Sequence, residues 1–302
     1  MKIALVGCGY QGAKFIPEIM ELQQTGIVEF AGIADVDPRR LTQIAETYHP
    51  PCDGYTDHRA LIGFADAAVI AVPNHLHFDV AKAWIEAGKD VLLEKPICQT
   101  SAEAEQLTAL ASKNGVRVVP GNIYQFSRLI KEIMTAKKEL GVINGINMRW
   151  VTPVIQSERD LLLDLLPHVL DILFIITGEY PTEVSGAYDG FDIMKSHTTL
   201  TYSFKDWKAR VEIGWFLPVK HRSIEIIGSK RWLHTDVARD LQFFWLTDPS
   251  TGKVEERWIP ANNTMQDELR FFVSGRKNPH LLADAVSGLR LIEQTRSALR
   301  GE

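Results

Sequence analysis

Up to about residue 120, short apolar runs alternate with segments in which apolar residues recur at helical spacing. The apolar runs, which are expected to be buried strands, are Lys2–Val6, Val28–Ala34, Ala67–Val72, Asp90–Glu94 and Val116–Val119. The segments between them that are expected to be helical are Ala13–Gln24, Pro38–Tyr48, His75–Ala87 and Thr100–Asn114. This alternation predicts a parallel, doubly wound α/β sheet, in which ligands bind at the carboxyl ends of the strands.

Beyond residue 120 the pattern changes to apolar and polar positions that alternate one by one. Residues 142–155 look extended, and further strands are expected at 181–188, 197–204, 208–216, 222–227, 232–235 and 241–246. Helices are expected at 126–140, 160–177 and 281–299. Period-two alternation with short turns is typical of an antiparallel sheet with one covered face. We therefore expect a second, α+β domain at 121–302 with a largely antiparallel open sheet, whose final helix is able to pack back on the first domain.

A glycine-rich loop follows the first expected strand directly, in the stretch LVGCGYQG at residues 5–12. Gly7 would permit a tight turn, Gly9 would let the backbone approach a pyrophosphate, and Gly12 would let the next helix pack closely. The N-terminus of that helix offers N–H groups and a partial positive charge to phosphates. The alternative is a tight turn in an ordinary strand–helix unit, because glycines cluster in many loops.

A dinucleotide-binding loop predicts an acidic residue about 20 residues further on, at the end of the second strand. Asp35 occupies that place. Its carboxylate could accept hydrogen bonds from both ribose hydroxyls of NAD, and it would repel the 2′-phosphate of NADP. Loop, helix and acid together predict a Rossmann dinucleotide-binding domain at 1–120, with NAD favoured over NADP. Arg39 and Arg40 follow closely, and they either weaken that preference or lie on a solvated helix face.

The composition narrows the class of protein. The chain has 302 residues, enough for two domains, and its 45% hydrophobic and 24% charged residues are ordinary for a soluble protein. A net charge of −5 and the lack of a dense basic cluster argue against nucleic-acid binding. The 3 cysteines form no CxxC pair, which argues against disulfides and structural zinc and fits a reducing cytoplasm. No set of His, Asp, Glu and Cys has metal-binding spacing.

The N-terminus lacks the design of a signal peptide, because its apolar run is broken by Gly7 and no small-residue cleavage site follows. The most apolar stretch is Leu161–Ile176. It contains Asp164, His168 and Asp171, and we therefore do not expect it to span a membrane.

Three motifs stand in order along the chain: GCGYQG at 7–12, VPNHLHFDVA at 72–81 and EKPI at 94–97. With them the chain closely resembles the Gfo/Idh/MocA oxidoreductases, the relatives of glucose–fructose oxidoreductase and inositol dehydrogenase. The resemblance is strong over residues 1–120 and weaker beyond, in D-x-x-x-H at 164–168 and in the final helix. It implies NAD(P)-dependent oxidation or reduction of a carbon in a sugar, cyclitol or related small molecule.

The resemblance implies that Lys95 is the active-site lysine beside the nicotinamide, and that a cis peptide bond joins it to Pro96. Loss of hydride from a carbinol carbon also requires loss of the hydroxyl proton. A free lysine, with a pKa of about 10.4, is a poor base at neutral pH, and burial or a nearby cation would lower that pKa. Still protonated, Lys95 could instead polarise a carbonyl during reduction. The alternative is a surface lysine at the end of a strand.

By the same resemblance, His168 is a catalytic histidine and Asp164 is its partner. Their i, i+4 spacing puts both on one helix face, which Asp171 continues. Because such groups are costly to bury unpaired, either a substrate pocket or a plain core salt bridge is expected to pair them. The glycines that are usual in the family around this motif are replaced here by Asp160, Leu166 and Pro167. These replacements leave the shape of the pocket and the substrate open.

The resemblance also implies which residues would hold the cofactor. Besides the three glycines and Asp35 they are Tyr10, Gln11, Pro73, Asn74, His77, Glu94 and Lys95. Glu94 would orient the lysine turn or contact the ribose. Gln125 stands where many members have arginine, so that a contact usual in the family would be missing. Three further residues, His197, His221 and Arg222, belong to the expected sheet region. We expect them either to reach the substrate from the sheet or to be structural or exposed.

We therefore predict a cytoplasmic NAD(P)-dependent oxidoreductase that acts on a CH–OH group of a sugar-like or cyclic polyol-like substrate. The resemblance implies that the open sheet forms a homo-dimer or homo-tetramer. Two alternatives stay open: an NAD(P)H-dependent reductase of a C=O or C=N bond in a biosynthetic pathway, and a non-catalytic dinucleotide sensor. The joint presence of Lys95, Asp164 and His168 argues against the sensor.

Overall fold

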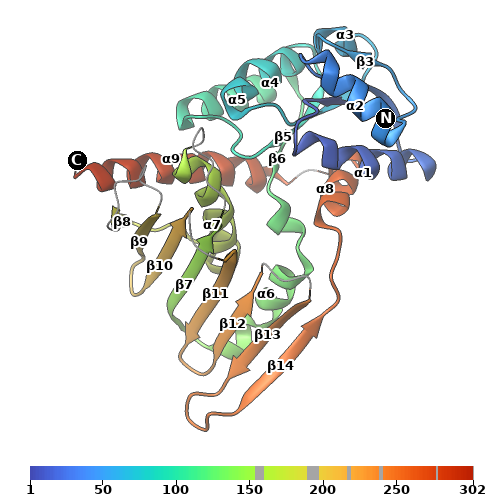
Figure 1. Cartoon of the computed structure of the whole chain (residues 1–302). Coiled ribbons are helices and arrows are strands. Elements are labelled where there is room, and N and C mark those ends of the chain that lie inside the picture. Colours follow the sequence, from blue (N-terminus) through green and yellow to red (C-terminus); the bar gives the residue numbers. More distant parts are fainter. Residues whose placement is uncertain (154–159, 189–196, 216–218, 238–240, 277, 302) are drawn as a thin grey trace. The chain divides into compact units, whose positions relative to one another are not determined.

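The computed structural model of the chain describes residues 1–153, 160–188, 197–215, 219–237, 241–276 and 278–301 (Figure 1). The chain forms two compact units. The first comprises Met1–Ile123 and Asn263–Leu289, and the second comprises Tyr124–Asn262 and Arg290–Glu302. None of the helices in the described ranges has the length and apolar character needed to cross a membrane.

The first unit contains a six-stranded sheet in the order β3-β2-β1-β4-β5-β6. Its strands are β1 Lys2–Val6, β2 Glu29–Ala34, β3 Gly54–Tyr55, β4 Ala67–Ile70, β5 Asp90–Glu94 and β6 Val118–Gly121. Every pairing is parallel, which confirms the predicted doubly wound sheet. The carboxyl ends of β1, β2, β4 and β5 therefore lie along one edge of the sheet.

The sequence predicts the helices of this unit except Arg59–Ile62 and Thr264–Val273. The helices are α1 Gly12–Gln24, α2 Pro38–Tyr48, α3 Arg59–Ile62, α4 His77–Glu86, α5 Ser101–Asn114, α8 Thr264–Val273 and α9 Pro279–Arg300, whose residues up to Leu289 belong to this unit. Asp37 caps α2 by accepting from the Arg39 N–H, and Thr100 and Glu103 form a capping box at the start of α5. Helix α1 buries Phe15, Ile16, Ile19 and Leu22 in the core of the unit.

The second unit is built on an eight-stranded sheet in the order β14-β13-β12-β11-β7-β10-β9-β8. Its strands are β7 Ile143–Val151, β8 Glu183–Tyr188, β9 His197–Ser203, β10 Lys208–Gly214, β11 His221–Gly228, β12 Trp232–Asp236, β13 Gln242–Thr247 and β14 Val254–Ile259. The pair β7–β10 is parallel and the other pairings are antiparallel, so the prediction of a largely antiparallel sheet is confirmed.

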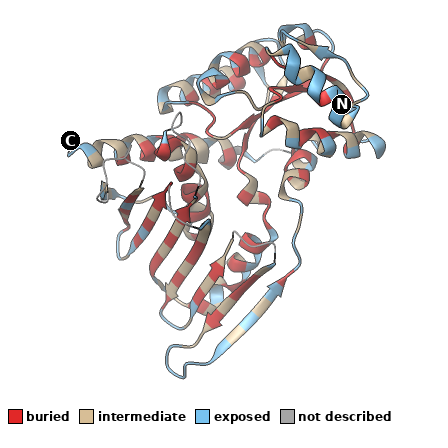
Figure 2. Ribbon diagram, viewed as in Figure 1, coloured by how far each residue is buried: buried red, intermediate tan, exposed pale blue. Residues whose placement is uncertain are grey.

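One face of this sheet is covered by α6 Arg128–Leu140 and α7 Leu161–Thr177, and we call it the inner face. Its side chains alternate with those of the outer face, as period-two patterning predicts. Leu200 and Tyr202 of β9, and Val211 and Ile213 of β10, are fully buried on the inner face. Figure 2 shows this alternation as buried and less buried bands along the strands.

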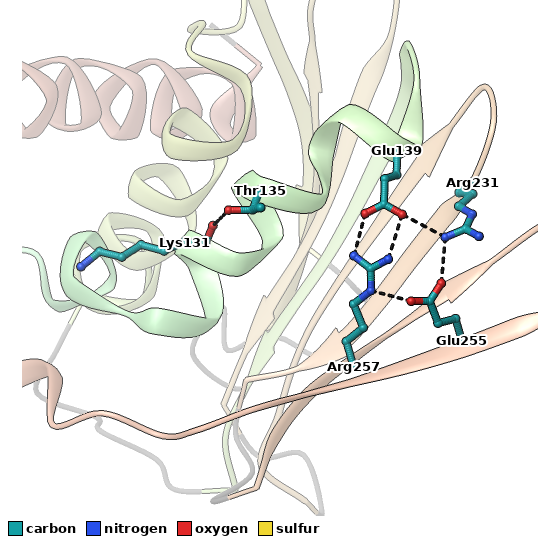
Figure 3. A network of polar contacts seen from close by, with 6 residues as sticks. All are labelled: Lys131, Thr135, Glu139, Arg231, Glu255 and Arg257. Atoms are coloured by element: carbon teal, nitrogen blue, oxygen red, sulfur yellow. Dashed lines mark hydrogen bonds and ion pairs between the residues drawn. The ribbon is translucent and has the colours of Figure 1, made fainter.

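A network of two acids and two arginines links α6 to the far strands of the inner face (Figure 3). Arg257 of β14 donates to both carboxylate oxygens of Glu139, at 2.6 and 2.8 Å, and to Glu255 at 2.7 Å. Arg231 donates to Glu139 at 3.1 Å and to Glu255 at 3.0 Å. Because two inner positions of β14, Glu255 and Arg257, are charged and not apolar, hydrophobic periodicity did not predict this strand.

The structure corrects several expected boundaries. Strand β4 ends at Ile70, and residues Asn74–Leu76 form a separate 3₁₀ turn (η1) before α4 begins at His77. A second 3₁₀ turn (η2), Ile123–Phe126, precedes α6, whose N-cap is Ser127. Sequence periodicity also missed β3, α3 and α8. Residues 154–155 and 216, which were expected to be extended, lie outside the described residues.

Candidate active site

The glycine loop between β1 and α1 has the backbone that its three glycines predict. Gly7 has a φ of +93°, and a Cβ there would lie 2.6 Å from the Ala71 carbonyl oxygen. A Cβ on Gly12 would collide with the Gly7 carbonyl, so that any larger residue would push α1 away from the loop. At Gly9 the nearest atom to such a Cβ is Arg40 Nη1, at 3.8 Å. Gly9 therefore leaves open space where a ligand could approach the backbone.

The N-terminus of α1 suits an anion. Its N-cap residue, Gln11, makes no side-chain capping bond, and no acidic residue lies in its first turn. The partial positive charge of the helix end is therefore not offset by an acid of this turn. Lys14 adds a full charge nearby, with its Nζ 4.1 Å from the ring centre of the exposed Tyr10. These features fit the pyrophosphate of a dinucleotide.

Asp35, at the end of β2, is tied to the glycine loop. One carboxylate oxygen accepts the Cys8 N–H at 2.8 Å, and the other accepts the Asp37 N–H at 2.9 Å. The Arg40 guanidinium lies 3.6 Å from the same carboxylate, whose side chain is 4% exposed. A carboxylate has about four acceptor positions, so two backbone bonds do not exhaust it. Both arginines are exposed and each pairs with an acid, Arg39 with Asp37 and Arg40 with Asp35.

Glu94 links the glycine loop to the end of β5. Its carboxylate accepts from Gln11 Nε2 at 2.8 Å and from the Lys95 N–H at 3.1 Å. Burial raises the pKa of Glu94 above its usual value, and the hydrogen bond from Gln11 opposes that rise. Lys95 itself is half-buried, and its bond to Pro96 is cis, in agreement with the resemblance.

His77, at the start of α4, is buried and contacts two backbone carbonyls. Nδ1 lies 2.7 Å from the Pro96 oxygen, and Nε2 lies 2.8 Å from the Val72 oxygen. Burial lowers the pKa of His77, so the neutral ring is favoured, and a neutral ring can donate to one of these carbonyls only. His77 thus holds the turn after Lys95 beside the end of β4. Asn74 is half-buried and Pro73 is exposed at the same strand end.

The buried cysteine in the loop has no reactive chemistry. Burial raises the pKa of the Cys8 thiol to about 12, so that it stays protonated at neutral pH. Cys8 contributes to the site through its backbone N–H, which donates to the carboxylate of Asp35. Among the residues that the structure describes, no group of His, Cys, Asp and Glu is placed to hold a metal ion.

The second unit gathers polar and aromatic side chains near His168 of α7. The Tyr124 ring meets the His168 ring edge-on at 5.4 Å, and Trp150 of β7 lies 6.3 Å from His168. Gln125 donates to Asp171 at 2.6 Å. The amide of Gln125, at the position where the family's arginine was expected, therefore donates to one oxygen of a buried carboxylate. Asp164 is half-buried on the same helix.

Of the three sheet residues that might reach a substrate, only Arg222 lies beside His168's aromatic neighbours. Its Nη1 donates to the Tyr124 hydroxyl at 3.3 Å, and its guanidinium lies 5.0 Å from the Trp150 ring. His197 lies on the outer face, paired with Glu212 at 2.9 Å. His221 neighbours Arg222 on β11 and so points to the outer face. The sequence did not identify Tyr124 and Trp150 as site residues, because aromatic residues in apolar segments are typical of a protein core.

Comparison with known proteins adds to this geometry. Residues 1–122 match the family model for an oxidoreductase family with an NAD-binding Rossmann fold, the Gfo/Idh/MocA group. UDP-N-acetylglucosamine 3-dehydrogenase of Acidithiobacillus ferrooxidans is 26% identical over 186 residues, which is 61% of this chain and 56% of that protein. Inositol 2-dehydrogenase of Salmonella paratyphi B is 29% identical over 192 residues, 60% of this chain and 56% of that protein.

The alignments with these two relatives thus span about half of their length. A solved structure of the Acidithiobacillus ferrooxidans enzyme superposes with a TM-score of 0.87 at 20% identity, and covers 100% of this chain and 98% of that one. At this identity the superposition establishes the fold of the chain.

Proposed function

Because residues 1–122 match the family model of the Gfo/Idh/MocA oxidoreductases, we propose that the chain is an NAD(P)-dependent dehydrogenase of a sugar-like or cyclic polyol-like compound. The observation that carries the proposal is the hydrogen-bonded edge of the parallel sheet. There the glycine loop, Asp35, Glu94 and Lys95 are joined by bonds between Cys8 and Asp35 and between Gln11 and Glu94. Relatives named for inositol and for a UDP-sugar support this substrate class.

The residues of the loop would hold the dinucleotide. Gly7, Gly9 and Gly12 with the α1 N-terminus would receive the pyrophosphate, and Asp35 would accept ribose hydroxyls at its remaining acceptor positions. Tyr10, Gln11, Pro73, Asn74, His77 and Glu94 would line or position the same site. When bound, the nicotinamide would exchange a hydride with the substrate carbon. We propose NAD as the preferred cofactor because of the carboxylate of Asp35.

Lys95 would move the proton of the reacting hydroxyl. In oxidation the C–H electron pair leaves as hydride, the O–H bond breaks, and neutral Lys95 Nζ takes the proton. In reduction the protonated amine returns it to the carbonyl oxygen. Glu94 fixes the lysine turn through the Lys95 N–H, and His77 fixes it through the Pro96 carbonyl. We assign His168 and Asp164 a supporting role in proton transfer.

The outer face of the eight-stranded sheet is proposed to bind a second copy of the chain. Trp232 and Trp258 are exposed there by 46% and 60%. Three acids of this face already have hydrogen-bond donors within the sheet: Glu212 pairs with Arg149, Glu225 with Asn147, and Glu256 with Trp245. A partner that covers the face could leave these bonds in place.

The test is reduction of NAD and NADP over a panel of sugars, sugar phosphates, nucleotide sugars and inositols. The Lys95→Ala variant should lose at least about 100-fold in kcat for the substrate found, which is the usual loss for a positioned acid or base. Lys113→Ala, on the exposed side of α5, is the matched control and should keep full activity. Cofactor binding, followed by NADH fluorescence, should be similar in all three proteins.

Two results would contradict the proposal. Turnover that survives in Lys95→Ala would remove Lys95 as the proton carrier. Tight NADH binding without turnover on any substrate would favour a dinucleotide sensor.

A further inference from the structure

Among the residues that the structure describes, no carboxylate forms an ion pair with Arg222. Its side-chain interactions within the described part of the chain are the hydrogen bond to Tyr124 and the contact with the Trp150 ring. The other arginines that are partly buried at the sheet have acids: Arg149 pairs with Glu212, Arg231 with Glu139, and Arg257 with Glu255. Arg222 therefore carries a charge that the fold of this unit does not use.

The guanidinium is held on a rigid support. Arg222 of β11 is the direct cross-strand partner of Trp150 on β7, and both lie on the inner face. Trp150 is fully buried, so its ring cannot turn away from beneath the arginine. Stacking on an indole fixes the plane of the guanidinium while leaving its N–H groups free to donate in that plane. Such a plane suits the paired oxygens of a carboxylate or phosphate.

Tyr124 adds a second donor at the same place. Its hydroxyl oxygen accepts from Arg222, so the hydroxyl proton points elsewhere. Burial raises the pKa of Tyr124, and the phenol therefore stays protonated and able to donate. Of the nearby acid Asp171, the oxygen Oδ1 accepts from the amide of Gln125 at 2.6 Å.

The pair also lies close to the proposed proton-transfer residue. Tyr124 contacts Arg222 through its hydroxyl and His168 through its ring, with the two rings 5.4 Å apart. A group bound by Arg222 would thus be separated from His168 by one tyrosine side chain.

We propose that Arg222 and Tyr124 bind an anionic oxygen group of the substrate, a carboxylate or a phosphoryl group. The inference rests on the proposed function, because it assigns the substrate of the same enzyme. It narrows the class from neutral sugars and polyols to their acids and phosphate esters. A carboxylate or phosphoryl group has several lone pairs, which can accept hydrogen bonds from the N–H groups of Arg222 and the hydroxyl of Tyr124.

The test measures binding of three probes that differ in one substituent: glucose, glucuronate and glucose 6-phosphate. Titration calorimetry on the full chain should show at least one anionic probe binding roughly 10- to 100-fold more tightly than glucose, the range expected for hydrogen bonds to a charged group. Arg222→Met should remove this preference without changing the affinity for glucose. Which anionic probe responds distinguishes the carboxylate from the phosphoryl source.

Three variants separate recognition from structure. Arg222→Lys should restore part of the preference, since the charge returns without the planar donors. Tyr124→Phe, which keeps the ring, should lose a smaller part. Arg59→Met, at an exposed position of α3, should behave as wild type. A purely structural role for Arg222 would instead weaken all three probes together and lower the melting temperature.

The inference is overturned if the anionic probes bind no better than glucose, or if their preference survives Arg222→Met. Its failure can be told from failure of the proposed function. Lys95-dependent oxidation of glucose that ignores Arg222 would leave the dehydrogenase standing and overturn the anion site. Arg222-dependent binding of the anionic probes, with no turnover of any substrate, would support the anion site and overturn the proposed dehydrogenase.

Discussion

At the scale of single residues, Asp35 combines two tasks. It anchors the glycine loop through the Cys8 N–H, and it carries the charge on which the proposed preference for NAD depends. Its ion pair with Arg40, at 3.6 Å, offsets part of that charge. The cofactor preference therefore depends on a balance between one acid and one arginine.

We expect Asp35→Ser to shift the ratio of kcat/KM for NADP over NAD upward by about 10- to 100-fold, the range for hydrogen bonds to charged groups. The change removes the repulsion of a 2′-phosphate and releases Arg40 to bind it. Serine can still accept one loop N–H. Steady-state kinetics with both cofactors measures the ratio, and Asp79→Ser on the exposed side of α4 is the control. An unchanged ratio would show that Asp35 serves the loop alone.

The sequence predicted the glycine loop and Asp35 because these residues lie close together along the chain. Gly7, Gly9 and Gly12 are constrained by one turn, and Asp35 follows at the distance that a strand–helix–strand unit sets. Arg222 and Tyr124 were different, since 98 positions separate them in the chain. Their contact depends on the pairing of β11 with β7, which no local pattern specifies. Asp171 likewise finds Gln125 through tertiary packing.

At the scale of elements, hydrophobic periodicity predicted strands whose inner positions are apolar and missed the one whose inner positions are charged. Strand β14 alternates Glu255 and Arg257 toward α6 with Trp258 toward the outer face. Helix α8 was missed although Asn263 caps it by accepting from the Gln266 N–H. Both elements are secured by polar contacts of specific geometry, which an average over apolar positions does not detect.

The network of Figure 3 predicts an acid-sensitive contact between α6 and β14. Hydrogen bonds from Arg257 hold the pKa of Glu139 below its usual 4.5. The stabilisation is therefore complete above that usual value and is lost as the pH falls through the lowered one. Glu139→Gln should cost about 0.5–1 kcal/mol at pH 7, because the pair is partly exposed.

Urea unfolding at pH 7 and pH 3 measures this effect, with the solvated Glu132→Gln of the same helix as control. The difference between Glu139→Gln and wild type should shrink at the lower pH. An equal difference at both values would show that the ion pairs contribute nothing to it.

At the scale of the whole molecule, the proposed self-association through the outer face predicts a change of mass. Trp258→Asp places a charge in the middle of the exposed aromatic side chains of β12–β14 and should shift the protein toward the monomer. Light scattering coupled to size exclusion measures this mass. Val142→Asp, at a 71% exposed position outside the sheet, should leave it unchanged. A wild-type protein that is monomeric throughout would refute the association.

The hydrogen bonds that hold the glycine loop also bear on the thermodynamics of binding. A loop that must order itself around a ligand loses about 1–2 kcal/mol of backbone entropy per residue. Here Asp35 restrains Cys8, and Glu94 restrains Gln11, within the folded chain. That entropy is lost during folding, before any ligand arrives. The loop is thus preorganised, and the affinity for a dinucleotide would reflect the contacts it makes more than the ordering of the protein.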